Sequence, residues 1–177
     1  MLERRVLHVY SRPTVGQRRE RNNVKYMNNN MFLFFYGEFT DETLDRMPDE
    51  NGIYIVYKVR YNEIRDEYSG VLYYIGQSKK VKTRIREHLT DDDFNDALSD
   101  GYELWYTYAK VANQNSLDAI ENALIYTQQP EKNVKLKDSY NYGPISIIAC
   151  GYCPLVHKYI NLSINLKVRT LYSERSS

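Results

Sequence analysis

The 177-residue sequence contains no apolar run approaching the roughly 20 residues of a membrane-spanning helix. Its start, "MLERRVLHVYSRPTVGQRRERNN", lacks the sustained apolar core of a secretory signal. We therefore expect a cytoplasmic protein with no membrane partner. No internal repeat, helix-turn-helix or long interdomain linker is visible, and the length fits one domain, with appended arms at most.

Cysteine is also scarce, since the only two are Cys150 and Cys153. They form a C-x-x-C in "ACGYCPLVH" that is followed by His157, and three soft ligands at short spacing could make most of a zinc site. A fourth ligand is not evident, and a thioredoxin-like βαβ setting for a redox pair is missing. We expect two reduced structural cysteines, with zinc as the alternative.

The formal net charge of +1 conceals a segregation of charge along the chain. Residues 1–30 carry a net charge of +5, residues 31–130 a net charge of −8 and residues 131–177 a net charge of +4. Basic ends around an acidic middle suit a protein that grips a polyanion. Solvated termini of an ordinary domain would give the same pattern.

The middle of the chain alternates between strand and helix patterns. β-branched and aromatic residues predict strands over 53–61, 71–76 and 102–111, and apolar periodicity predicts helices over 79–89, near 91–101 and over 115–128. The short connector "NEIRDEYSG" allows only an antiparallel hairpin between the first two strands. We predict an α+β fold with a small antiparallel sheet, three-stranded at its core, flanked by helices.

The flanking segments are less regular. "MFLFFYGEF" (31–39) reads as a strand or buried anchor, "TDETLDRMPDENG" (40–52) has the chemistry of a helix start, and "PISIIA" (144–149) and "NLSINLKVRTLY" (161–172) are possible strands. We therefore divide the chain into a basic arm (1–50) that contacts DNA, a central module (51–135) and an extension (136–177) that packs on the module. The extension is a candidate for DNA recognition or dimer contacts.

Six residues of the central module have side chains suited to phosphodiester hydrolysis. Arg84 and His88 project from the same helix face, and two phenols, a carboxylate and an amide complete the set: Tyr54, Tyr74, Glu121 and Asn133. Such groups could neutralise the phosphate, activate water and hold a metal ion. On composition alone, solvated helix faces and packing residues explain them equally well.

The order and spacing of these residues resemble the GIY-YIG endonuclease family. "GIY" at 52–54 and "YIG" at 74–76 are literal matches to the two tripeptides, and they are followed in order by Arg84, His88, Glu121 and "P-x-x-N" at 130–133. The resemblance covers about residues 50–135. Five elements in order, with Arg84 and His88 counted as one, on matching strands, helices and loops, are far more specific than either tripeptide alone.

The resemblance implies a catalytic role for each matched residue. Tyr54 is expected to lie by the attacking water as general base, Tyr74 to position phosphate and water, and His88 to assist proton transfer or orient Tyr54. Arg84 is expected to stabilise charge on the scissile phosphate.

It also implies a cofactor. Glu121 is expected to bind one divalent cation per active site, Mg²⁺ with Mn²⁺ as a substitute, and Asn133 resembles the family's supporting polar residue.

A free phenol has a pKa near ~10, so a basic Tyr54 needs its pKa lowered. Arg84, the metal ion or one of the lysines Lys79, Lys80 and Lys82 could do this. We expect those lysines, with Arg18, Arg19 and Arg21 of the arm, mainly to contact the DNA backbone. Gly76 is expected to leave space where strand meets helix near a phosphate.

A compact module with interwoven extensions resembles the type II restriction enzymes of this family. That resemblance implies sequence-specific cutting of double-stranded DNA by a homodimer, each protomer cutting one strand of a palindromic site. We see no context of a large multidomain excision-repair subunit. The alternatives are a repair, mobile-element or structure-selective nuclease and, from another class, an inactive DNA-binding module.

Overall fold

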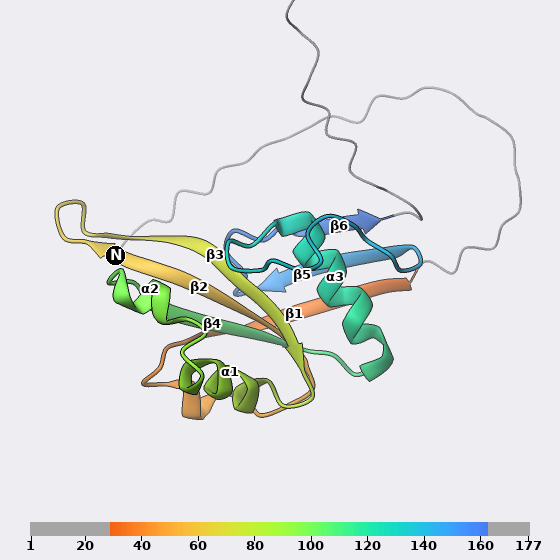
Figure 1. The fold of residues 1–177 in the computed structure, drawn as a ribbon. Coiled ribbons are helices and arrows are strands. Elements are labelled where there is room, and N and C mark those ends of the chain that lie inside the picture. The colour runs from red at the N-terminus through yellow and green to blue at the C-terminus, as the bar shows by residue number, and fades with distance from the viewer. Residues whose placement is uncertain (1–28, 163–177) are drawn as a thin grey trace, which may run out of the picture.

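The computed structural model describes residues 29–162 of the protein, which form one mixed sheet with a few short helices (Figure 1). The strands are β1 (Asn29–Phe39), β2 (Gly52–Asn62), β3 (Glu67–Ser78), β4 (Glu103–Lys110), β5 (Ile145–Gly151) and β6 (Tyr159–Leu162). The helices are η1 (Leu44–Arg46), α1 (Val81–Thr90), α2 (Asn95–Ser99), η2 (Gln114–Ser116) and α3 (Leu117–Gln128). The α+β class is therefore confirmed.

The sheet is larger than the three-stranded sheet that the sequence suggests. Its strand order is β3-β2-β4-β1-β5-β6, and all neighbours are antiparallel except β1 and β5, which are parallel. The expected hairpin is present as β2 and β3. Because β1 lies between β4 and β5, residues 29–39 are an integral part of the sheet rather than of a separate arm.

Most predicted elements have the expected type. The segment 40–52 is the exception, because it forms only the three-residue η1 instead of a longer helix. Helix α1 begins at Val81, with Lys80 in the N-cap position, and the Ser78 hydroxyl accepts a hydrogen bond from the Lys80 N–H at 3.0 Å. "PISIIA" lies in β5 except for its first residue, Pro144. "NLSINLKVRTLY" overlaps β6 only in its first two residues and otherwise lies outside the described range.

Each face of the sheet carries its own hydrophobic core. Strand β2 is buried on both sides, so its alternate residues enter different cores. Ile53, Ile55 and Tyr57 pack with α3, while Tyr54 and Val56 pack with residues of α1 and α2. Tyr54 therefore points towards the α1 face of the sheet.

A bulge in β3 places two consecutive tyrosines on that same face. The pairing of β2 with β3 shifts by one residue between Val56, opposite Tyr74, and Tyr57, opposite Leu72. The extra residue is Tyr73, and both Tyr73 and Tyr74 pack in the core of the α1 face. Without the bulge, one of the two would point to the α3 face.

Asn133 completes the outer edge of β3. Its side-chain amide donates to the Ile75 carbonyl, and its side-chain oxygen accepts from the Ile75 N–H, both at 2.9 Å. The N–H groups of Glu131 and Lys132 bond to the carbonyls of Leu72 and Tyr73 in the same way. The loop after α3 therefore takes the place of a neighbouring strand, and Asn133 holds the backbone between Tyr74 and Gly76.

Some expectations fall outside the described residues, among them the DNA contacts of Arg18, Arg19 and Arg21. Within residues 29–162, no helix is both long and apolar enough to cross a membrane.

We predict that Asn133→Ala lowers the free energy of unfolding by about 2–6 kcal/mol, because it leaves two buried backbone groups of Ile75 without partners, at about 1–3 kcal/mol each. Urea denaturation would measure the loss. Asn141→Ala is the matched control, because the Asn141 side chain is exposed and bonds only to the nearby Ser139 hydroxyl. Equal stability of the two variants would contradict this role for Asn133.

Candidate active site

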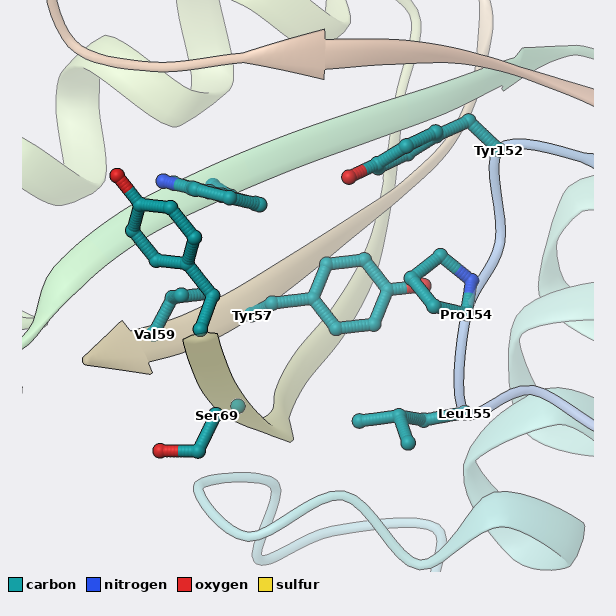
Figure 2. A pocket seen from close by; sticks show the side chains of 9 residues that line it. Tyr57, Val59, Ser69, Tyr152, Pro154 and Leu155 are labelled. Carbon is teal, nitrogen blue, oxygen red and sulfur yellow. The ribbon is translucent and has the colours of Figure 1, made fainter. Parts of the chain in front are cut away.

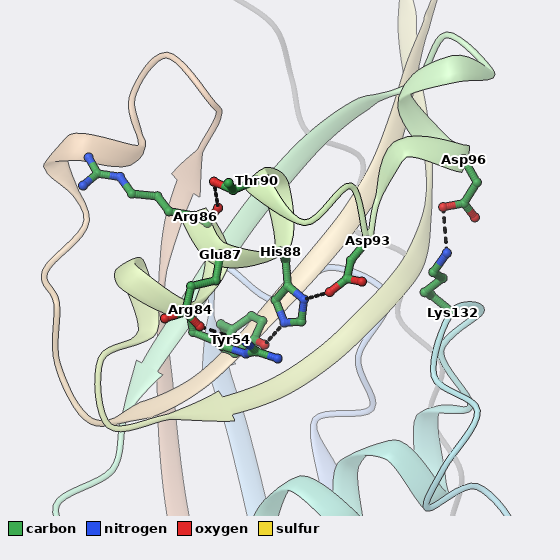
Figure 3. Close-up of polar contacts among 9 residues, drawn as sticks. All are labelled: Tyr54, Arg84, Arg86, Glu87, His88, Thr90, Asp93, Asp96 and Lys132. Atoms are coloured by element: carbon green, nitrogen blue, oxygen red, sulfur yellow. Dashed lines mark hydrogen bonds and ion pairs between the residues drawn. The ribbon is translucent and has the colours of Figure 1, made fainter.

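The centre of the site is a chain of three hydrogen-bonded side chains (Figure 3). The Tyr54 hydroxyl lies 2.8 Å from Nε2 of His88, and Nδ1 of His88 lies 2.7 Å from a carboxylate oxygen of Asp93. Tyr54 is 1% exposed and His88 is 4% exposed. The two rings are therefore fixed by packing as well as by hydrogen bonds.

Helix α1 places His88 by its apolar spacing. Val81, Ile85 and His88 recur at helical spacing and share the buried face of the helix. The ring of Phe94 stacks on His88 with centroids 5.0 Å apart, and the ring of Tyr74 meets His88 edge-on at 5.3 Å. The imidazole thus fills a slot between the helix, the sheet and the turn after α1.

Gly76 makes room for the Tyr54 ring. The two residues are cross-strand partners, and a Cβ on Gly76 would lie 2.4 Å from the Tyr54 hydroxyl oxygen and 2.5 Å from the carbon that bears it. The ring therefore crosses directly over the glycine backbone. The glycine of "YIG" is needed for the position of the phenol, which is a more specific reason than the expected space beside a phosphate.

The expectation that the pKa of Tyr54 is lowered is wrong for the protein alone. Burial, and then the nearby Tyr74 phenol, raise the pKa of Tyr54 far above its usual value. The guanidinium of Arg84 acts in the opposite direction but does not outweigh burial. Tyr54 is therefore a neutral phenol in this site, and its proton can be donated to Nε2 of His88.

Arg84 and Tyr74 form the outer part of the site. Arg84 is half-buried, lies beside Tyr54 in Figure 3, and bonds through its guanidinium to the Glu87 carboxylate at 2.8 Å. Tyr74 is half-buried, with its ring centroid 6.1 Å from that of Tyr54. Both side chains thus sit between the buried phenol and solvent.

Glu121 approaches the same site from α3. It is half-buried, and this burial raises its pKa to about 7, although hydrogen bonds from Gln77 oppose the increase. Its charge in turn raises the pKa of both Tyr54 and Tyr74. The structure therefore brings Glu121 close to the two phenols, although it comes from the opposite side of β3.

The ligands available for a divalent cation are few. Residues 29–162 contain no group of three or more His, Cys, Asp or Glu side chains that could hold a metal ion. A single desolvated carboxylate whose anionic form is disfavoured does fit Mg²⁺, which often uses one or two carboxylates together with waters and substrate phosphates. Glu121 is the side chain that meets this description.

The remaining predicted residues lie away from this centre. Lys79 and Lys80 are exposed at the start of α1, and the half-buried Lys82 donates to the Asp45 carbonyl at 3.3 Å. Cys150 and Cys153 are free cysteines, and within the described range they belong to no group of three or more possible metal ligands, so reduced structural cysteines stay a prediction.

A hollow lies on the face of β2 opposite to Tyr54 (Figure 2). It has a volume of about 250 Å³ and is lined mainly by aromatic and apolar side chains, including Tyr57, Tyr68, Trp105 and Leu155. None of the predicted catalytic residues lines it. Tyr57 is therefore a packing residue on the other face of the strand that carries Tyr54.

Asp93 is the contact that the sequence does not predict. It lies in the run "DDD" at 91–93, where three identical side chains follow one another, so nothing in the sequence distinguishes one aspartate from the next. The turn makes the distinction, because Asp92 has a left-handed conformation (φ 58°) and the Asp93 N–H bonds back to the His88 carbonyl at 3.0 Å.

We predict that Glu121→Gln stabilises the free protein above pH 7. The folded-state pKa of Glu121 is about 7, raised from the usual 4.5. The carboxyl's favourable contribution to folding stability is therefore complete below pH ~4.5 and is lost as the pH rises through 7. The gain for the glutamine variant should be on the order of 1–2 kcal/mol at pH 8 and near zero at pH 4.5, discounted for partial exposure. Thermal unfolding in EDTA at both pH values measures it.

Glu63→Gln is the matched control because Glu63 is exposed. The same stability difference for Glu121→Gln at both pH values would show that the carboxyl is not desolvated in the folded protein.

Comparison with known proteins supports the identity of the central region. Residues 50–135 match the model of the GIY-YIG catalytic domain. UvrABC system protein C of Nautilia profundicola is 29% identical over 116 residues, which are 60% of this chain and 17% of that protein. The protein of the same name from Methanococcus maripaludis is 31% identical over 103 residues, 57% of this chain and 18% of that protein. No solved structure matches significantly.

The chain thus spans less than a fifth of the length of these relatives. The matched region contains the strands, helices and loop that bring Tyr54, Tyr74, Arg84, His88 and Glu121 together. Residues 50–135 are thus similar to the catalytic domain of the GIY-YIG family, and the UvrABC relatives support that similarity.

Proposed function

We propose that the protein is a divalent-metal-dependent DNA endonuclease that hydrolyses phosphodiester bonds. The observation that carries this proposal is the buried Tyr54 phenol, hydrogen-bonded to His88 and surrounded by Arg84 and Glu121. A proton acceptor, an always-charged guanidinium and a carboxylate for a cation are the groups that this hydrolysis requires.

In the proposed reaction, water attacks phosphorus from the side of Tyr54. The phenol oxygen accepts a proton from the water as the phenol's own proton passes to Nε2 of His88. Because the phenol stays neutral before this step, its raised pKa does not prevent it from working. Arg84 releases Glu87 and donates to the phosphate oxygens, where negative charge develops.

Glu121 and the substrate phosphate would hold Mg²⁺ or Mn²⁺, which when bound supplies Lewis-acid stabilisation of the leaving oxygen. Asn133 acts indirectly, by holding the β3 backbone between Tyr74 and Gly76. Lys79, Lys80 and Lys82, together with Arg18, Arg19 and Arg21, are proposed backbone contacts that add affinity without sequence preference.

More specifically, we propose sequence-specific cutting of duplex DNA by a homodimer, as in a type II restriction enzyme. The support is that the sheet extends beyond the matched region: β1 and β5 join the central strands in one sheet, so the nuclease region is built into a larger body. The regions 1–50 and 136–177 supply DNA recognition and dimer contacts in this proposal.

The second candidate is a repair, mobile-element or structure-selective nuclease. It is favoured by the relatives, which are named as protein C of a UvrABC system and are thus one part of a larger system. In that case the protein would nick one DNA strand next to a branch in the DNA or next to a bound partner protein, rather than cut both strands of a palindromic site.

One assay separates these candidates. The protein is incubated with unmethylated duplex, branched and nicked DNA in Mg²⁺, and the ends are sequenced. Double-strand ends at one short motif support restriction, and nicks or branch-dependent ends support the second candidate. Absence of any metal-dependent product would instead indicate a DNA-binding module and refute the nuclease proposal.

We predict that Tyr54→Phe lowers kcat by about 10²–10⁴-fold with KM little changed, because the variant keeps the ring but has no hydroxyl to pass on a proton. Single-turnover cleavage measures the rate. Tyr68→Phe is the matched control, since Tyr68 is 56% exposed and lies outside the site. A Tyr54→Phe enzyme at the wild-type rate would refute the role of the phenol.

We also predict that Glu121→Ala loses Mg²⁺-dependent cleavage while still binding DNA. The cleavage rate is expected to fall by at least about 10²-fold at a Mg²⁺ concentration of about 10 mM. This is the order of magnitude expected when charge stabilisation at the leaving group is lost. DNA affinity, measured by fluorescence anisotropy in EDTA, should stay within about twofold. Wild-type dependence of the rate on Mg²⁺ would contradict the assignment.

A further inference from the structure

We propose that Asp93 is a positioning residue that sets the tautomer of His88, so that Nε2 is free to take the proton of Tyr54. This inference rests on the proposed nuclease function and adds to it a residue outside the matched family motif. It starts from the two hydrogen bonds of His88, at 2.8 Å to Tyr54 and 2.7 Å to Asp93.

The chemistry of the partners decides which nitrogen carries the proton. An ionised carboxylate can only accept hydrogen bonds, so Nδ1 of His88 must be the protonated nitrogen that donates to Asp93. In the neutral ring, Nε2 then has a free lone pair and can only accept, so it receives the hydroxyl hydrogen of Tyr54. The opposite tautomer would point an N–H at the phenol and could not take its proton.

The fold keeps this arrangement in place. His88 is nearly fully buried and stacks on Phe94, so its ring cannot turn over without disturbing the core of the α1 face. Asp93 is held by its backbone bond to the His88 carbonyl and by the left-handed turn at Asp92. The groups that meet the imidazole are Tyr54, Tyr74, Phe94 and Asp93, and of these only Asp93 carries a negative charge.

The proton balance of the step shows what Asp93 contributes. As the oxygen of water bonds to phosphorus, one of its protons moves to the Tyr54 oxygen and the phenol's proton moves to Nε2 of His88. The leaving oxygen departs with the bonding electron pair and takes a proton from solvent. His88 is then an imidazolium beside the Asp93 carboxylate, which stabilises that charge without itself being protonated.

Asp93→Asn tests this role. The asparagine amide can donate to Nδ1, which moves the ring proton to Nε2 and reverses the hydrogen bond to Tyr54. We expect kcat to fall by about 10²–10⁴-fold with KM within about twofold. At pH 8 we also expect the two ring nitrogens of His88 to swap their ¹⁵N chemical shifts, so that Nε2 has the shift of a protonated nitrogen and Nδ1 that of an unprotonated one. A merely structural loss would not produce this change. Only three histidines are present, which keeps the spectrum simple.

Two further variants complete the test. Asp91→Asn changes an exposed aspartate two residues away and should leave both the rate and the tautomer as in the wild type. Asp93→Glu keeps a carboxylate and should retain the Nδ1-protonated ring and recover most of the rate. An Asp93→Asn protein that keeps the wild-type tautomer, or that switches tautomer without losing rate, overturns the proposal.

The test also distinguishes this inference from the proposed function. If the wild type cuts no DNA under any condition, the proposed function fails, and with it the catalytic role of Asp93. The nitrogen shifts would still decide whether Asp93 sets the tautomer of His88.

Discussion

The rest of the site depends on one hydrogen bond, between the buried Tyr54 hydroxyl and Nε2 of His88. It can form only because Gly76 has no side chain under the tyrosine ring, and because α1 brings the imidazole to the same face of the sheet. Asn133 matters for the same reason, since it holds the edge strand on which Gly76 lies. Residues that are far apart in the sequence thus serve the placement of a single phenol.

Burial has two consequences for the proposed chemistry. Burial makes ionisation of Tyr54 unfavourable, so a Tyr54 that is already ionised before the substrate binds does not fit this site. It also makes the neutral phenol a good relay, because its one proton is already directed to an acceptor. At Glu121 the same effect works differently: a desolvated carboxylate is unfavourable alone and is stabilised by a cation, which links metal binding to the local electrostatics.

Much of this arrangement could be predicted from the sequence. The spacing of Val81, Ile85 and His88 gives the buried face of α1, and the two tripeptides place Tyr54 and Tyr74 on neighbouring strands. The central position of β1 could not be predicted, because strand patterns do not reveal which strands pair across the chain. Nor could the bulge at Tyr73 or the role of Asp93, since both depend on local backbone geometry within runs of similar residues.

The central claim, that Tyr54 works as a neutral phenol, can be tested by following the tyrosine ¹³Cζ resonances while the pH is raised from about 6 to about 10.5, around the usual phenol pKa of ~10. Comparison with Tyr54→Phe identifies the Tyr54 signal among those of the 18 tyrosines. We predict that Tyr54 shows no tyrosinate signal at pH 10, where exposed tyrosines are half ionised. A tyrosinate signal from Tyr54 at pH 8 in the free protein would contradict it.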